Sequence, residues 1–265
     1  MNKALLDPKI HITVLLVTVL SEFIGIKRIT VGPGVMLFLP MLYALVITGA
    51  LTIKRLGFFK REQSVAASPL ITLSILFLVA RIAVIIGPNI MTIIAAGPAL
   101  LLQELGNLGT IFLALPVALL LGLKREAVGA THSIAREPNV ALISEDYTLD
   151  SPEGLGVLGV YVIGTLFGAI FMGLFAGFLA STTPLHPYAL AMASGVGSGS
   201  MMAASSGSLL ALFPDMKDQI AAFAGASNLI STGSGLYVSI FVALPLTEWL
   251  YKKLEPVLGR KKSVE

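Results

Sequence analysis

The sequence contains no cysteine, only three histidines and few charged residues. Without cysteine the chain forms no disulfide, thiolate metal site or thiol redox centre. His11, His132 and His186 lie far apart and form no HExxH pair, so we expect no metal site and no metalloenzyme. Charged residues make up 12% of the chain, about half the share found in soluble domains, which argues against a soluble protein.

The abundant residues are apolar. Hydrophobic residues make up 55% of the chain and the mean hydropathy is +0.88, which predicts an integral membrane protein in contact with the lipid bilayer. The 265 residues allow about seven to nine spans and no separate soluble domain. We therefore expect one all-α membrane domain over residues 1–265, without strands. The net charge of +3, with Lys and Arg at segment ends, argues against a nucleic-acid partner.

Three apolar runs at the start of the chain, residues 10–26, 35–53 and 69–86, predict membrane spans. Pro40 lies inside the second run and should kink it, because it removes one helix hydrogen bond. Two cationic clusters predict that both termini are cytoplasmic by the positive-inside rule. These clusters are Lys54, Arg55, Lys60 and Arg61 in a loop, and Lys252, Lys253, Arg260, Lys261 and Lys262 in the tail.

The stretch from Ser194 to Ser208 contains almost only glycine, serine, alanine and methionine between apolar flanks. Each of its four glycines costs about 1 kcal/mol in a helix relative to alanine, so we expect the helix to be interrupted there. Irregular backbone at membrane depth is tolerated only where protein covers it or a wet cavity adjoins it. Close helix packing through Gly195 and Gly199 is the alternative interpretation. The six serines of the stretch favour a polar-lined interruption.

Residues 128–153 are the least hydrophobic part of the chain. One interpretation is a cytoplasmic loop. The other is a second interrupted element, because residues 129–143 can be laid over residues 197–211 without a gap. Both segments pass from small and hydroxyl residues through a polar turn to an apolar run, the pattern of a structural repeat in transporters. We place the repeat elements at residues 129–180 and 197–250.

Two further segments carry polar residues at three- and four-residue spacing, which places them on one helix face. The first, residues 99–110, contains two glycines, and we expect them to interrupt the segment, although its polar face could also satisfy helix ends at a loop. The second is followed by Gly233-Ser-Gly235, where we expect another break. The polar residues are Gln103, Glu104, Asn107 and Thr110 in the first segment, and Ser227, Asn228, Ser231 and Thr232 in the second.

Two sets of motifs carry a resemblance to known families. At residues 129–133 and 197–200 the chain resembles small bacterial carriers with a Gly/Ser/Thr-rich broken element in each of two repeats, such as sodium/glutamate symporters, lysine exporters and 2-hydroxycarboxylate carriers. At residues 106–110, 136–139 and 150–154 it is most similar to an uncharacterised bacterial membrane family, a domain of unknown function, over nearly the whole chain.

The resemblance to the carriers implies an elevator-type transporter in the bacterial cytoplasmic membrane. It implies a homodimer, scaffold helices over residues 10–88, and a transport core over residues 89–251 that moves against them. It also implies coupling to Na⁺ or protons, with no other cofactor.

These patterns predict a secondary active symporter for a small organic anion or amino acid that works by alternating access. Arg136 would neutralise a substrate carboxylate through a bidentate pair. The predicted substrate-binding residues are Thr131, His132, Ser133, Arg136, Asn139, Ser198, Ser200, Ser205 and Ser206. The predicted ion-coupling residues are Glu104, Asn107, Glu137, Asn228, Ser231 and Thr232.

The alternative function is a channel or holin-like membrane protein, in which the same polar faces line a pore. We do not expect an enzyme, because no serine stands in a G-x-S-x-G motif and the glycine-rich stretch lacks the lysine and threonine of a phosphate-binding loop.

Overall fold

The structure of the chain is a computed structural model that describes residues 7–31, 34–53, 56–60, 62–63, 86–132, 134 and 136–259, with the single positions 67, 70, 77, 80 and 84. Most of the predicted third span, residues 69–86, lies outside the described residues, as do Lys54, Arg55 and Arg61 and the cationic tail from Arg260 onward. Helices dominate the described part of the chain, as expected for the predicted class.

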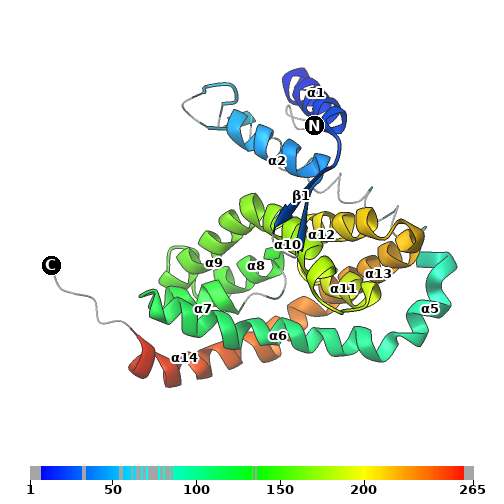
Figure 1. The fold of residues 1–265 in the computed structure, drawn as a ribbon. Helices are drawn as coiled ribbons and strands as arrows, with labels where there is room; N and C mark the ends of the chain where they lie inside the picture. The colour runs from blue at the N-terminus through cyan, green and yellow to red at the C-terminus, as the bar shows by residue number, and fades with distance from the viewer. Residues whose placement is uncertain are drawn as a thin grey trace.

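The N-terminal residues form an arm that projects from the body of the molecule (Figure 1). Asp7 caps the first helix of this arm by accepting a hydrogen bond from the Lys9 N–H at 2.9 Å. The arm is held to the body through Val35, whose N–H donates to the Ser181 hydroxyl at 2.8 Å. Its elements are α1 (Pro8–Ile24), β1 (Lys27–Val31), β2 (Gly34–Phe38) and α2 (Pro40–Leu51).

The hairpin in this arm corrects two predictions. Strands were not expected, yet β1 and β2 pair antiparallel with Lys27 opposite Phe38. The β-branched residues at positions 29–31 and 35 favour extended backbone. Pro40 does not kink a helix, because it is the first residue of α2, where a missing N–H leaves no hydrogen bond unmade.

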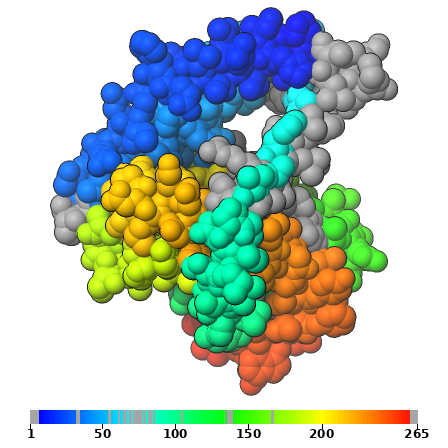
Figure 2. Space-filling view, turned by 90° about the vertical axis from the view of Figure 1, so that its right-hand side faces the viewer, coloured from blue at the N-terminus to red at the C-terminus, as the bar shows by residue number. Residues whose placement is uncertain are grey.

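The body begins with a short 3₁₀ turn, η2 (Gly87–Asn89), and two helices that follow it, α5 (Ile90–Ala95) and α6 (Gly97–Leu120). In Figure 2, α5 and the start of α6 run over the face between α12 and α13. The next elements are α7 (Glu126–Thr131), α8 (Arg136–Asp146), α9 (Pro152–Ile163), the π-helical turn η3 (Gly164–Gly168) and α10 (Ala169–Thr182).

The last third of the chain has the same sequence of element types: two short helices and then a long helix with a π-helical turn. Its elements are α11 (Pro187–Ser194), α12 (Gly199–Leu212), the 3₁₀ turn η4 (Pro214–Met216), α13 (Lys217–Val238), the π-helical turn η5 (Ser239–Ala243) and α14 (Leu244–Leu258).

Two predicted breaks are wrong. α6 runs without interruption through Gly106 and Gly109, and α13 runs through Gly233 and Gly235. A glycine costs a helix only about 1 kcal/mol, and the main-chain hydrogen bonds and packing of a long apolar helix outweigh that cost.

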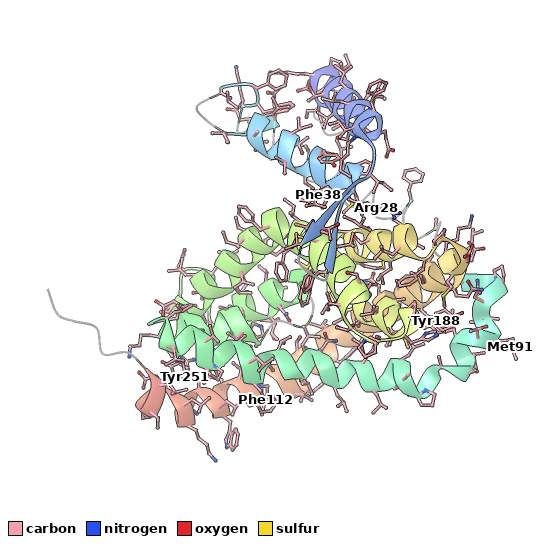
Figure 3. All side chains as sticks on the ribbon, viewed as in Figure 1. Arg28, Phe38, Met91, Phe112, Tyr188 and Tyr251 are labelled. Carbon is pink, nitrogen blue, oxygen red and sulfur yellow. The ribbon has the colours of Figure 1, made fainter. Side chains whose placement is uncertain are left out.

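The described residues bury several small apolar clusters and expose many large apolar side chains. The largest cluster joins α5, α6, α11, α12 and α13 through residues such as Leu100, Leu190 and Phe223. In contrast, Met91 on α5 is 74% exposed and Phe112 on α6 is 52% exposed, and both project from the helices (Figure 3). Two helical stretches, Gly97–Leu120 and Pro214–Leu258, are long and apolar enough to cross a membrane.

Candidate functional site

The chain leaves helical conformation between α11 and α12. Helix α11 ends at Ser194, and α12 begins at Gly199. Gly197 has φ +98°, a left-handed conformation that favours glycine because a Cβ would clash with the backbone. Ser198 then caps α12, since its hydroxyl accepts from the Met201 N–H at 3.4 Å. We call residues 195–198 the first interruption.

Helix α13 covers the first interruption through Asn228. The Asn228 Nδ2 donates to the carbonyl oxygen of Gly195 at 2.9 Å and to that of Gly197 at 3.1 Å. Gly195 lies so close to α13 that an added Cβ would overlap the carbonyl oxygen of Ala224. Asn228 therefore satisfies two carbonyls that the end of α11 leaves without helical partners.

A second polar contact joins α6, α11 and α13 one residue earlier on α13. The buried Ser227 hydroxyl lies 2.7 Å from the carbonyl oxygen of Met192 and 2.8 Å from Oε1 of Gln103. A hydroxyl has one proton and can donate to only one of them. Gln103 Nε2 is buried without a partner among the described residues. With the Gln103 amide turned over, Nε2 donates to Ser227 and Ser227 donates to Met192, so the network favours that orientation.

A cavity of about 160 Å³ adjoins the first interruption between α10, α11 and α12. An apolar cavity of this size holds a molecule about as large as benzene. Its polar lining comes from Ser194 and Ser205, and the apolar lining comes from Met172, Phe175, Ala176, Leu179, Leu190, Ala193, Val196 and Met201.

The chain leaves helical conformation a second time between α7 and α8, at His132 and Ile134, and we call these two residues the second interruption. His132 is fully buried, and its Nδ1 lies 3.0 Å from the carbonyl oxygen of Val128. That contact makes Nδ1 the donor, so Nε2 presents a lone pair, which has no partner among the described residues. Ile134 packs against Ile111 of α6 and Ala243 of η5.

Helix α13 contacts the first interruption, and the π-helical turn that follows it contacts Ile134 of the second interruption and the helix α8 beyond it. Ser239, the first residue of η5, donates to Asn139 Oδ1 at 2.7 Å, and both residues are fully buried. Asn228 and Ser239 are eleven residues apart, which corresponds to about 16 Å along a helix. The two contacts therefore lie on the same continuous helix but are separated along it.

Each interrupted pair of helices packs against the π-helical turn of the other half. In the first half, Gly168 of η3 leaves space for Met201 of α12, because an added Cβ would overlap the end of that side chain. In the second half, Ser239 of η5 bonds Asn139 of α8. π-helical turns are rare and occur frequently at functional sites.

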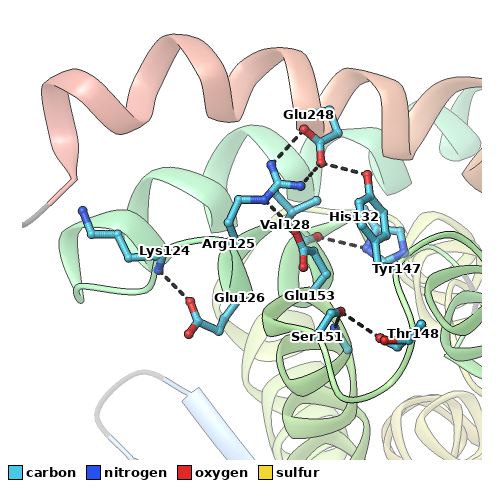
Figure 4. Close-up of polar contacts among 11 residues, drawn as sticks. Lys124, Arg125, Glu126, Val128, His132, Tyr147, Thr148, Ser151, Glu153 and Glu248 are labelled. Atoms are coloured by element: carbon cyan, nitrogen blue, oxygen red, sulfur yellow. Dashed lines mark hydrogen bonds and ion pairs between the residues drawn. The ribbon is translucent and has the colours of Figure 1, made fainter.

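An ion cluster fixes the outer ends of α7, α8 and α9 to α14 (Figure 4). Arg125 Nε donates to Glu153 Oε1 at 2.5 Å. The two terminal nitrogens of Arg125 donate to the carboxylate of Glu248, Nη1 to Oε2 at 2.9 Å and Nη2 to Oε1. The Tyr147 hydroxyl donates to Glu248 at 2.9 Å. We call these four residues the Arg125 cluster.

The cluster shifts the pKa values of its members. The carboxylate of Glu248, and after it that of Glu153, raises the pKa of the Arg125 guanidinium despite its partial burial. Burial and the neighbouring Glu248 raise the pKa of the Tyr147 hydroxyl to about 12. Arg125 therefore stays charged and Tyr147 stays a hydrogen-bond donor at neutral pH.

The predicted substrate-binding hydroxyls divide into two groups. Thr131, Ser205 and Ser206 donate to carbonyls of their own helices, at 2.8, 2.8 and 2.6 Å. Ser198 and Ser200 instead lie 3.2 Å apart at the start of α12, next to the first interruption. Of the predicted hydroxyls that the structure describes, Ser198 and Ser200 therefore lie next to the first interruption, and Thr131 directly precedes the second.

The remaining predicted residues are spread over α6, α8 and α13. Asn107 of α6 and Ser231 of α13 are buried, whereas Thr232 is exposed. Ser133 lies outside the described residues. The side chains of Glu104, Arg136 and Glu137 also lie outside the described part, so their roles stay predictions.

Sequence reasoning did not include the Arg125 cluster or the Gln103–Ser227 contact among the site residues. A charge in a chain of this composition needs a partner, which is a usable signal for Arg125, Glu153 and Glu248. The signal does not identify the partner, because 123 residues separate Arg125 from Glu248.

A family model described as a protein of unknown function, DUF3100, matches residues 19–253 of the chain. No curated protein and no solved structure matches it.

Proposed function

The chain belongs to the DUF3100 family of proteins of unknown function, and we propose that it is a secondary active transporter of a small organic anion or amino acid. The proposal places it in the bacterial cytoplasmic membrane as a homodimer that works by alternating access. The observation that carries the proposal is the pair of helix interruptions within an apolar chain. Asn228 of α13 bonds the first interruption, and Ser239 of η5 bonds Asn139 of α8, the helix that follows the second.

A membrane location is supported by the surface of the helices. Large apolar side chains such as Phe23, Leu113 and Phe241 are more than 70% exposed on three different helical elements. Soluble monomers rarely expose apolar surface of this extent, whereas a lipid-facing surface is apolar by necessity. The two helical stretches of sufficient length supply the first candidate spans.

Solute binding is supported by the chemistry of the first interruption. The beginning of α12 offers backbone N–H groups and a positive helix end to an anionic group. Ser198 and Ser200 add two hydroxyls at the same point. The end of α11 is the negative end of a helix, and its carbonyl oxygens can bind a cation. An interrupted membrane helix with these two ends is how known transporters hold an anion and its coupling cation.

We assign a complementary role to the second interruption. There Arg136, at the start of α8, supplies positive charge for a carboxylate, and His132 presents a buried acceptor. Asn228 and Ser239 lie about 16 Å apart along α13 and η5, and each bonds one of the two regions, so the solute path runs along this helix from one interruption to the other. In this scheme the cationic loop at residues 54–61 and the cationic tail face the cytoplasm, as do both termini.

Counterflow in proteoliposomes tests the proposal. Vesicles are loaded with unlabelled glutamate, lysine, malate and citrate, and the uptake of each labelled compound from outside is followed. A transporter accumulates one of them transiently and saturably, because exchange needs alternating access. Linear, non-saturating entry without accumulation indicates a channel or holin-like pore and contradicts the proposal, as does the absence of any entry across an enlarged panel of carboxylates and amino acids.

A further inference from the structure

We infer that the first interruption is a sodium site formed by the carbonyl oxygens of Gly195 and Gly197 and the amide oxygen of Asn228. The inference rests on the proposed transporter function for its biological role, as the site of the coupling ion. The site itself is argued from the geometry of these three residues.

The two carbonyl oxygens converge on one point. Both lie within 3.1 Å of the same atom, Nδ2 of Asn228, although they belong to residues two positions apart in the chain. The left-handed conformation of Gly197 produces this convergence by turning the main chain back. Two oxygens directed at one point repel each other unless a positive group lies between them, and the amide hydrogens of Asn228 supply that group.

A sodium ion can replace the amide hydrogens at this point. The two ends of an asparagine amide have nearly the same shape, so the side chain can turn over and present Oδ1 where Nδ2 now lies. Without a cation this orientation places three oxygens against one another. With a cation it gives three oxygen ligands that converge on the ion. Asn228 therefore closes the interruption when the site is empty and coordinates the ion when the site is filled.

The surrounding chemistry favours a monovalent cation. The ligands are neutral oxygens at the negative end of α11, whereas protein sites for Ca²⁺ use several carboxylates. Within the described residues no group of three or more His, Cys, Asp or Glu side chains could hold a metal ion. Once the Gln103 amide takes the orientation that the Ser227 network favours, its buried carbonyl oxygen has no donor among the described residues. That oxygen is a further acceptor in the same region of α13.

Binding of radiolabelled Na⁺ to the purified full-length protein tests the site, with choline as the replacement cation. We expect saturable binding to the wild type. Asn228→Ala removes one of the three ligands and should weaken binding at least about tenfold, since loss of an outer-shell partner alone costs that much. Asn228→Asp should bind at least as tightly as the wild type, because it keeps the oxygen ligands and adds a charge. Ser234→Ala, which removes a hydroxyl bonded within α13, is the matched control and should bind normally.

The aspartate variant separates a ligand from a structural role. If Asn228 only held the interruption closed through its N–H groups, Asn228→Asp would lose those bonds and bind no better than Asn228→Ala, and this result would overturn the inference. Absence of saturable binding to the wild type would overturn it as well. If Asn228→Ala does not fold, the comparison of Asn228→Asp with the wild type decides. Because this assay measures no transport, loss of saturable Na⁺ binding rejects the sodium site and leaves the transporter proposal standing, whereas counterflow that is independent of Na⁺ rejects only the role of the site in coupling.

Discussion

Replacing Arg125 by glutamine removes the positive charge that holds Glu153 and Glu248. The Glu153 side chain is only 7% exposed and that of Glu248 is 19% exposed, so both carboxylates would be left partly buried without their cation. Breaking a fully buried pair costs about 3–5 kcal/mol, and an exposed pair is worth about 1 kcal/mol or less. Because the Arg125 side chain is 33% exposed, we expect an intermediate loss of about 2–3 kcal/mol.

The matched control is Lys124→Gln, one residue earlier. It removes the pair of Lys124 with Glu255, whose side chains are 35% and 30% exposed, and should lower the stability clearly less than Arg125→Gln does, because solvent screens an exposed pair. The assay is thermal unfolding of the purified protein in detergent at one fixed scan rate. For a chain of this size the loss at Arg125 corresponds to a fall in apparent Tm of roughly 4–12 °C.

A double-mutant cycle isolates the pair from other effects of the substitution. If Arg125 and Glu248 interact as described, Arg125→Gln combined with Glu248→Gln should be less destabilised than the sum of the single variants. The account of the cluster is refuted if Arg125→Gln lowers the apparent Tm no more than Lys124→Gln does, or if the two single effects simply add.

Two further predictions use glycine pairs and the same unfolding assay. Gly156→Ala should lower the free energy of unfolding by about 2 kcal/mol or more, because the added Cβ would overlap the Glu126 carbonyl oxygen. Gly159 lies in open space, so Gly159→Ala should be neutral or slightly stabilising. Equal effects of the two substitutions would contradict the close packing of α7 on α9. Gly197→Ala should lower the free energy of unfolding by about 1–2 kcal/mol, because alanine is strained in the left-handed backbone conformation of this residue. Gly199→Ala should be tolerated, because Gly199 lies in open space. A neutral Gly197→Ala would contradict the described turn.

The helical class could be predicted from composition, and the local backbone only in part. The glycines and serines of residues 194–208 predicted a change in the main chain, and α12 begins within that stretch, after a serine cap. Its location inside a membrane stays a prediction. The glycines in α6 and α13 also predicted a break, yet both helices are continuous. Each glycine costs a helix only about 1 kcal/mol, so the packing of the whole helix determines whether it breaks. The π-helical turns have no recognisable signal in the sequence.

The candidate site could be predicted as a set of residue types but not as a set of contacts. Asn228 stood on a predicted polar face, yet its acceptors, Gly195 and Gly197, lie more than thirty residues away and only the fold brings them together. The same holds for the Arg125 cluster, where composition indicates that charges must pair but not which ones.

The central claim is that the chain is embedded in lipid and that its first interruption is reached by solutes from water. The chain has no cysteine, so a single introduced cysteine reports on its own position. Intact membranes carrying Ser198→Cys or Leu113→Cys are treated with a small, charged methanethiosulfonate reagent. Leu113 is 75% exposed on α6, and the account predicts that its cysteine is shielded by lipid while the cysteine at Ser198 reacts. Fast reaction at position 113, or none at position 198, would contradict the claim.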